Sequence, residues 1–192
     1  MDMDMDMDVE PLFNPYRNIQ TSEHLQQLMA VNTNLSAQKC PKCQKGWQKR
    51  GRRCYSFSNE SLPWKEAREE CRCQGGDLAQ INSRKEQLFL MEQLSGKMET
   101  KDDKFWIGLT DSEEEGLWLW VDNSPLNSSL AFWAYKQPDD WMEEDSDGED
   151  CARMGEKGSP STMSSWFDKS CKVRHRHVCE KRALDIGVLT CG

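Results

Sequence analysis

The chain has 192 residues, and its 33 acidic and 25 basic side chains give a formal net charge of −8. Such an acidic protein is a poor candidate for binding nucleic acids or anionic membranes, because both partners are polyanions. No segment approaches the roughly 18 apolar residues that a membrane-spanning helix needs, and the Met–Asp repeat of residues 1–8 is not a secretory signal. The length suits one domain with an extension.

Nine cysteines are the most informative count in the composition. Such numbers are typical of extracellular domains, because disulfides persist in oxidising compartments. The count is odd, so at least one cysteine stays free, pairs with another chain or binds something else. We therefore expect an extracellular or cell-surface protein, although no signal peptide or membrane-spanning segment is visible in this chain.

The segment before the first cysteine predicts a tail and a short stalk. Residues 1–20 are of low complexity or interrupted by prolines, so we expect a disordered tail. In residues 21–39, steps of three and four residues lead from Leu25 to Leu35 through the polar Asn32, as in the seam of a coiled coil. We interpret this segment as a helical neck that can pair with a second chain.

Two helices are predicted early in the cysteine-bearing part. Ser61 can cap the first helix, with Pro63 in its first turn. Ser83 and Glu86 have the spacing of a capping box at the start of the second helix, whose apolar side would include Leu88.

Short aromatic-rich segments follow the two helices and predict strands. The expected strands cover 105–109, 117–121, 150–154, 166–168 and 176–179. Helices followed by hairpins predict an α+β fold with two helices and short antiparallel sheets. We expect this domain to span residues 40–182, with the chain beyond Cys179 loosely attached and 183–192 forming a C-terminal tail.

Seven short motifs occur in order between Cys43 and Glu180. They are Trp64-Lys65-Glu66-Ala67, Trp106-Ile107-Gly108-Leu109, Gly116-Leu117-Trp118-Leu119-Trp120-Val121-Asp122, Gln137-Pro138-Asp139, Glu149-Asp150-Cys151, Trp166-Phe167-Asp168 and His177-Val178-Cys179-Glu180. This segment, about three quarters of the chain, resembles the C-type lectin domain. With its stalk-like segment, the chain resembles type II lectin receptors of the asialoglycoprotein-receptor, dendritic-cell and natural-killer-cell lectin-like group, although their apolar span is missing here.

The resemblance implies three disulfides within the domain. The implied pairs are Cys71 with Cys179, Cys151 with Cys171, and Cys43 with Cys54. Cys40, Cys73 and Cys191 remain, and Cys40 beside the neck is the best candidate for a bridge to a second chain, which would give a homodimer. A zinc half-site at Cys40 and Cys43 is the weaker alternative, because a second CxxC motif is missing.

The resemblance also implies a Ca²⁺ site that binds sugar hydroxyls. The implied metal ligands are Gln137, Asp139, Glu149 and Asp168, and the same residues with Trp141 would bind the sugar. Pro138 would be a cis proline that directs its two neighbours toward the ion. The Gln-Pro-Asp sequence resembles the galactose-type site, so the expected ligand is a glycan with galactose or N-acetylgalactosamine.

Three features of the segment from Asp139 to Lys172 bear on this site. Phe167 stands where the family has an asparagine, and it offers no side-chain oxygen to an ion. Eight carboxylates lie between Asp139 and Asp150, and they repel one another unless cations neutralise them. A basic cluster near the last strand, which includes Lys169 and Lys172, either contacts an acidic partner or balances this loop.

The main alternative is calcium-independent recognition of a protein ligand, as in natural-killer-cell lectin-like receptors, and Phe167 favours it. A more distant alternative is an intracellular adaptor that acts through Tyr16. No nucleophile with a neighbouring base and no phosphate-binding loop occur in the sequence, so we do not expect an enzyme.

Overall fold

The computed structural model describes residues 39–143, 145–158 and 163–187. One compact unit spans Pro41–Leu184. The predicted tail of residues 1–20 and nearly all of the predicted neck lie outside the described residues. In the described part of the chain, no helix has the length and apolar character needed to cross a membrane.

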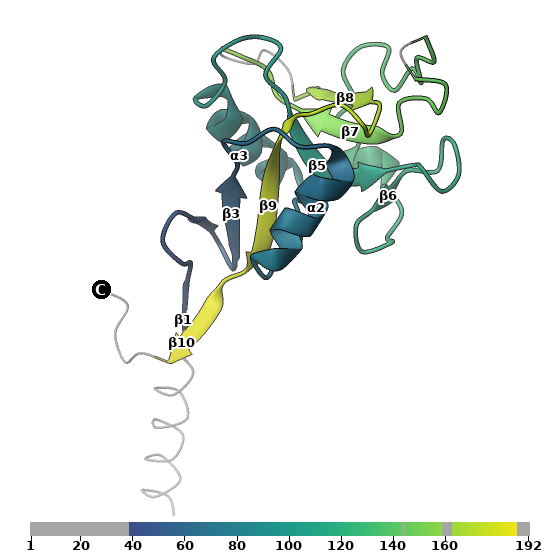
Figure 1. Ribbon diagram of the computed structural model, residues 1–192. Coiled ribbons are helices and arrows are strands. Elements are labelled where there is room, and N and C mark those ends of the chain that lie inside the picture. The colour runs from purple at the N-terminus through teal and green to yellow at the C-terminus, as the bar shows by residue number, and fades with distance from the viewer. Residues whose placement is uncertain (1–38, 144, 159–162, 188–192) are drawn as a thin grey trace, which may run out of the picture. The chain divides into compact units, whose positions relative to one another are not determined.

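A twisted sheet organises the compact unit (Figure 1). Its path among the described residues runs β2-β3-β9-β5-β7-β8, while β4 pairs with β9 and β6 with β5. The strands are β2 (Gln48–Arg50), β3 (Arg53–Phe57), β4 (Asp77–Leu78), β5 (Phe105–Thr110), β6 (Leu119–Trp120), β7 (Cys151–Met154), β8 (Trp166–Lys169) and β9 (Arg176–Arg182). β5 and β9 pair in parallel, while the other pairs in this sheet are antiparallel.

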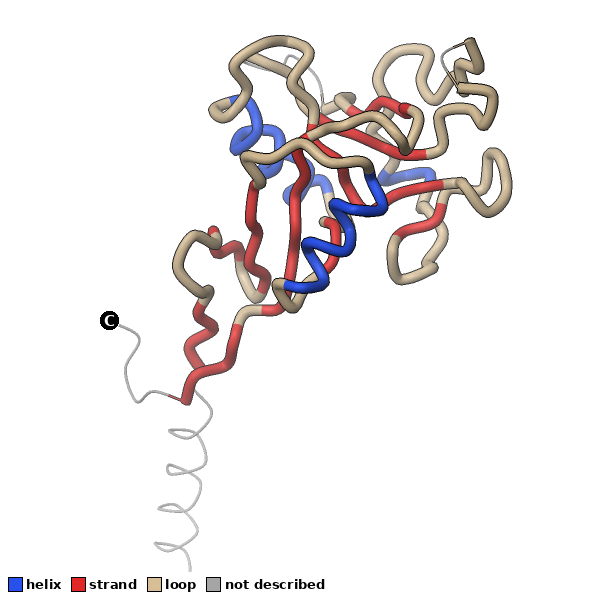
Figure 2. Tube along the Cα trace, in the orientation of Figure 1, coloured by secondary structure: helices blue, strands red, loops and turns tan. Residues whose placement is uncertain are grey.

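Two α-helices, α2 (Trp64–Cys73) and α3 (Arg84–Ser95), pack against this sheet (Figure 2). Residues of β5 divide between two buried clusters. Phe105 and Ile107 join the cluster that contains α3, and Trp106 joins the cluster that contains α2. Since successive side chains of a strand point to opposite faces, the two helices cover opposite sides of β5. The α+β prediction and all five predicted strands are confirmed.

The predicted cap of α2 is wrong. Pro63 occupies the N-cap position and no side chain caps the helix. The neighbouring residue Leu62 instead forms an antiparallel bridge with His175, and the Trp64 N–H donates to the Cys171 carbonyl at 2.9 Å. The free N–H groups of a first turn can donate to any carbonyl within reach, so a tertiary contact replaces the cap that Ser61 was expected to supply.

The capping box of α3 is present in half. Ser83 accepts a hydrogen bond from the Glu86 N–H at 3.2 Å. The Glu86 carboxylate, however, accepts from the Asn82 N–H and from the Tyr55 hydroxyl, because the buried tyrosine needs a partner. Leu88 is 52% exposed, so its place on the apolar side was also predicted wrongly.

The segment after Cys179 is not loosely attached as predicted. β9 continues to Arg182, which pairs with Arg53 of β3, and the Arg53 guanidinium forms an ion pair with Glu180. Farther on, β10 (Leu184–Gly187) pairs with β1 (Lys39–Lys42) in a separate two-stranded sheet. The expectation of a loosely attached tail is therefore wrong for the described part of this segment, because backbone pairing with β3 and β1 holds it.

All three implied disulfides are formed. The pairs are Cys43–Cys54, Cys71–Cys179 and Cys151–Cys171. Among the described cysteines, Cys73 is free and exposed. The Cys40 side chain, for which we predicted a bridge to a second chain, and residue Cys191 both lie outside the part of the chain that the structure describes.

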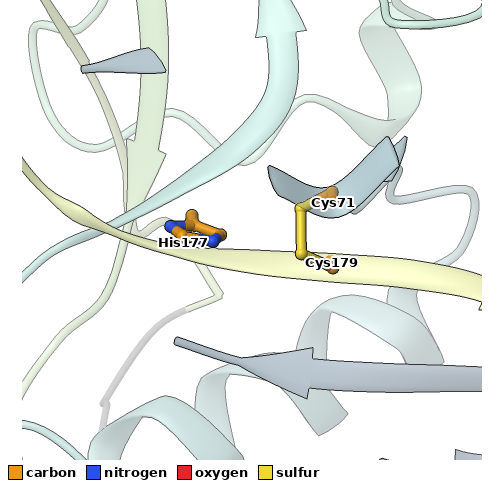
Figure 3. A group of neighbouring side chains, drawn as sticks. All are labelled: Cys71, His177 and Cys179. Atoms are coloured by element: carbon orange, nitrogen blue, oxygen red, sulfur yellow. A yellow bond between two sulfur atoms is a disulfide. The ribbon is translucent and has the colours of Figure 1, made fainter. Parts of the chain in front are cut away.

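His177 lies beside the Cys71–Cys179 bridge (Figure 3). The three side chains are close enough to share a metal ion, but both sulfur atoms are used in the disulfide. The imidazole is fully buried, and neither ring nitrogen has a hydrogen bond within the described structure. Burial lowers the pKa of His177 to about 4, and since the two neighbouring sulfur atoms are bonded to each other, we interpret the imidazole as a neutral core residue and not as part of a metal site.

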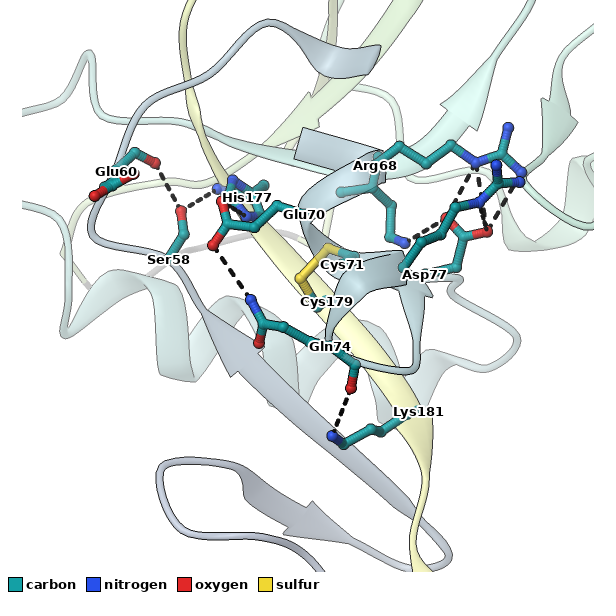
Figure 4. The surroundings of a disulfide bond; sticks show 12 residues. Ser58, Glu60, Arg68, Glu70, Cys71, Gln74, Asp77, His177, Cys179 and Lys181 are labelled. Carbon is teal, nitrogen blue, oxygen red and sulfur yellow. Dashed lines mark hydrogen bonds and ion pairs between the residues drawn. A yellow bond between two sulfur atoms is a disulfide. The ribbon is translucent and has the colours of Figure 1, made fainter. Parts of the chain in front are cut away.

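Polar contacts surround the same bridge (Figure 4). Arg68 on α2 forms an ion pair with Asp77 of β4 at 3.1 Å, and the Lys181 ammonium donates to the Gln74 carbonyl at 2.9 Å. Glu70 Oε2 lies 3.3 Å from His177 Nε2. The ion pair therefore joins α2 to β4, while the disulfide and the contacts of His177 and Lys181 join α2 and its C-terminal end to β9.

Candidate metal-binding site

Three of the four predicted metal ligands converge at one end of the sheet. Asp139, Glu149 and Asp168 each offer a carboxylate oxygen, and these oxygens lie within 4.8 Å of one another. They come from separate segments: the loop that follows the short helix η1 (Ser128–Leu130), the residues just before β7, and strand β8. Contacts between distant segments therefore assemble this carboxylate cluster.

Asp168 is the fixed point of the cluster. Its side chain is buried, and its Oδ2 accepts hydrogen bonds from the Asp139 and Asp140 N–H groups, both at 2.8 Å. The peptide bond between Gln137 and Pro138 just before this turn is cis, as predicted. A carboxylate on a regular strand thus holds the backbone of the loop that carries the Gln-Pro-Asp sequence.

Asp140 is a structural partner that the sequence analysis missed. Its Oδ1 accepts a hydrogen bond from the Glu149 N–H at 3.0 Å, so it connects the loop to a second member of the cluster. Gly148 has a φ of +90°, and a side chain there would collide with the Asp140 carboxylate. In the sequence, the only hint of this contact is that Asp139-Asp140 and Gly148-Glu149 stand nine residues apart.

The cluster fits a hard cation. Asp168 Oδ1 is buried and has no hydrogen-bond partner within the described structure. Buried polar atoms almost always have a partner, and Ca²⁺ prefers carboxylate oxygens. Burial raises the pKa of Asp168, although the two backbone hydrogen bonds oppose this effect. A divalent ion bound between the three carboxylates would give Asp168 Oδ1 the partner that it lacks.

The remaining predicted residues lie at the edge of the cluster. The Gln137 amide donates to the Asp139 carboxylate. Trp141 follows on the same loop and is 47% exposed. The ring of Phe167 lies under the Lys104 ammonium, which is 4.8 Å from the ring centroid. Phe167 therefore packs against a lysine and contributes no ligand atom.

Lysines neutralise part of the acidic loop. The Lys169 ammonium lies 2.7 Å from Glu149, and Lys172 pairs with Asp145 at 2.9 Å and Asp147 at 2.7 Å. Hydrogen bonds from Ser170 and Lys172 lower the pKa of Asp145 to about 2. The expected mutual repulsion of eight carboxylates is thus relieved in part by the protein's own cations, and it is a weaker argument for calcium than the sequence suggested.

A second acidic cluster was not predicted. Asp111, Glu115 and Asp150 also bring carboxylate oxygens within 4.8 Å of one another. Asp111 directly follows β5 and is buried; its Oδ2 accepts from the Gly116 N–H at 3.0 Å, while Oδ1 has no partner in the described structure. Burial raises the pKa of Asp111 to about 7. These residues could hold a second cation, and the Asp and Glu four residues apart were the available signal.

Comparison with known proteins agrees with this architecture. Residues 60–181 match the family model described as Lectin C-type domain. The chain is 39% identical over 141 residues to asialoglycoprotein receptor 2 of Mus musculus, an alignment that covers 73% of this chain and 42% of that receptor. It is 33% identical over 153 residues to the galactose-specific lectin nattectin of Thalassophryne nattereri, covering 80% and 89% of the two chains.

Solved structures show the same relationship. The carbohydrate-recognition domain of the mouse scavenger receptor C-type lectin matches with a TM-score of 0.62 at 32% identity, covering 75% of this chain and 99% of that one. The chain spans 42% of mouse asialoglycoprotein receptor 2 and 21% of mouse C-type lectin domain family 4 member F. The match to a lectin domain model and to a carbohydrate-recognition domain agrees with the expectation that this chain is not an enzyme. The chain belongs to the C-type lectin domain family.

Proposed function

We propose that this chain binds glycans that carry galactose or N-acetylgalactosamine, in a calcium-dependent manner, as part of an immune-type lectin receptor or of its soluble form. The observation that carries the proposal is the convergence of Asp139, Glu149 and Asp168 around an unpartnered buried oxygen. The proposal places the chain at the cell surface or outside the cell, where its disulfides are stable.

The residues of the cluster have distinct roles in this proposal. Asp139, Glu149 and Asp168 would hold the ion, with Gln137 at its edge. A bound calcium ion supplies coordination sites for two neighbouring sugar hydroxyls. The carboxylates accept hydrogen bonds from the same hydroxyls, and such charge-assisted bonds are stronger than neutral ones. The exposed face of Trp141 can stack on the apolar face of the sugar ring.

The names of the relatives support the sugar class. Nattectin is called a galactose-specific lectin, and the Gln-Pro-Asp sequence of this chain resembles the galactose-type site. For the oligomeric state, the relevant relative is a Kupffer cell C-type lectin receptor whose structure is described as trimeric; it is 31% identical and has a TM-score of 0.59. Self-association of this chain through the neck and Cys40 remains a proposal.

A second candidate function is calcium-independent recognition of a protein ligand. Phe167 in place of an oxygen ligand and the ion pair between Lys169 and Glu149 favour it. A calcium-independent type II antifreeze protein has the same fold, with 25% identity and a TM-score of 0.61. The fold therefore also occurs in a protein that is described as calcium-independent.

Retention on galactose-agarose, with and without a chelator, tests the proposed function. We expect retention in calcium that is lost in the chelator. Trp141→Ala should weaken retention, while Tyr135→Ala, which removes another exposed aromatic ring from the same loop, should leave it unchanged. Failure of the wild-type chain to be retained under either condition would contradict galactose binding, and retention that resists the chelator would contradict calcium dependence.

A further inference from the structure

Lys169 places an ammonium group against the carboxylate cluster. Its Nζ lies 2.7 Å from Glu149 Oε1, and the two side chains are only 14% and 6% exposed. An ammonium so close to a buried carboxylate is held by an attraction that solvent screens weakly. A side chain of the protein itself thus places a positive charge against one of the proposed metal ligands.

Lys172 provides a comparison within the same short segment. It also pairs with acidic residues of the loop, Asp145 and Asp147, but its side chain is 66% exposed. Exposed ion pairs contribute little, since water competes for both partners. The two lysines have the same charge and nearly the same place in the chain, and they differ in burial and in which carboxylate they contact.

Strand pairing and a nearby disulfide fix the backbone position of Lys169. It is the last residue of β8 and pairs with Cys151 of β7, which is bonded to Cys171. Its ammonium also lies 5.4 Å from the centroid of the Trp141 ring, within the range of a cation–π contact. One ammonium therefore contacts both a predicted metal ligand and the aromatic ring expected to stack on sugar.

We propose that Lys169 is a tethered cation that competes with calcium for Glu149 and holds Glu149 and Trp141 in place when calcium is absent. The inference rests on the proposed ion site. Calcium can use this Glu149 oxygen only after the ammonium has moved away, so Lys169 raises the calcium concentration at which the site fills. The same contact neutralises a buried carboxylate that would otherwise be left unpaired in the calcium-free protein.

Replacing Lys169 or Lys172 by methionine, an apolar side chain of similar length, distinguishes two effects. One is competition between an ammonium and calcium for Glu149, and the other is the general effect of a positive charge near the loop. We expect Lys169→Met to strengthen calcium binding roughly tenfold or more, as measured by isothermal titration calorimetry at fixed ionic strength. Lys172→Met removes an equal charge beside the same loop and should change calcium affinity by less than about threefold. Lys169→Arg, which keeps the charge, should remain close to wild type.

The calcium-free protein gives an independent readout. Lys169→Met should lower the calcium-free melting temperature more than Lys172→Met does, because Glu149 loses its partner, and calcium should restore it. Lys169→Gln keeps a hydrogen-bond donor, so it serves as the uncharged variant for calorimetry if the methionine variant does not fold.

Equal effects of the two lysine substitutions on calcium affinity would overturn the proposal, as would unchanged or absent calcium binding in the uncharged Lys169 variants. Retention on galactose-agarose, measured in parallel, separates this outcome from failure of the proposed function. Gain of calcium affinity in Lys169→Met without galactose retention would support the tethered cation and contradict the glycan class.

Discussion

At the scale of single residues, Phe167 and the buried imidazole of His177 lead to two predictions about this domain. By the resemblance, Phe167 stands where the family has an asparagine, and its ring packs under Lys104. His177 is neutral and fully buried beside a disulfide. The first residue bears on the affinity of the site for calcium, and the second on the dependence of stability on pH.

A side-chain oxygen at position 167 should strengthen the proposed calcium site. Phe167→Asn is expected to raise calcium affinity by roughly tenfold, because each ligand or positioning group of a metal site contributes at least that much. Titration calorimetry provides the measurement. Phe167→Leu is the matched control, since it shortens the same side chain without adding an oxygen. Equal calcium affinities of the asparagine and leucine variants would show that a side-chain oxygen at position 167 does not reach the ion.

Acid should destabilise the domain through His177. Its folded pKa is about 4, below the usual value of about 6.5, so the unfolded chain binds the extra proton between these limits. Stability from this group is complete above about pH 6.5 and falls as the pH drops toward 4, by about 3 kcal/mol in total.

Denaturant titrations at pH 7, 5.5 and 4 on wild type and His177→Phe measure this contribution. Asp111 and Glu180 have pKa values raised to about 7 by burial, and their protonation acts in the opposite direction. The difference between the two proteins therefore isolates His177. We expect the difference in unfolding free energy to shift in favour of the phenylalanine variant as the pH falls; parallel curves would show that the imidazole does not titrate in this range.

At the scale of elements, the loop between η1 and β7 depends on contacts with β8 and within itself. Asp168 on β8 fixes the turn at Asp139 and Asp140, and Asp140 in turn fixes Glu149. Gly148 makes the last contact possible, because a side chain there would meet the Asp140 carboxylate. The arrangement of the carboxylate cluster thus depends in part on the absence of a side chain at Gly148.

Gly148→Ala should therefore damage the cluster as well as the backbone. An L-residue at positive φ costs about 1 to 2 kcal/mol, and the displaced Asp140 should also reduce calcium affinity. Gly75→Ala is the matched control: its φ of +78° imposes a similar backbone cost, but a side chain there meets nothing within 4 Å. We expect similar losses in melting temperature from backbone strain, with loss of calcium affinity in the Gly148 variant alone. Equal calcium affinities would contradict the role of Gly148.

At the scale of the whole domain, the disulfides join elements that are distant in sequence. Cys71–Cys179 spans 108 residues and connects α2 to β9, whereas Cys43–Cys54 spans 11 residues within the first hairpin region. A cross-link that closes a longer loop removes more conformational freedom from the unfolded chain. The bridge beside His177 is therefore expected to be the main covalent contribution to stability.

Paired replacement of each bridge by alanines tests this expectation. In the chain-entropy description, loss of Cys71–Cys179 should cost about 4.7 kcal/mol and loss of Cys43–Cys54 about 3 kcal/mol. Denaturant unfolding of the two double variants under oxidising conditions gives the comparison. A larger loss from the short bridge would mean that local packing, rather than loop closure, determines what each disulfide contributes.

The sequence by itself was sufficient for the elements and for the family. The β-strands near Trp106 and Trp166, the start of α3 at Ser83 and the α+β class follow from patterns within a few residues, where local sterics and periodicity decide. The disulfide pairs and the convergence of Asp139, Glu149 and Asp168 were reached only through the resemblance. They could not be derived from spacing, because spacing carries no information on which distant segments meet.

Only the tertiary structure decided how those elements meet. It replaced the Ser61 cap with a strand contact, turned Leu88 toward solvent, and brought Asp111 to Asp150 in a second cluster. It also placed Lys169 against Glu149, 20 residues away. Electrostatic energies depend on the distance between charges and on their burial. The sequence shows the acidic loop but not that the Lys169 ammonium lies against Glu149, because that contact forms only when the chain folds.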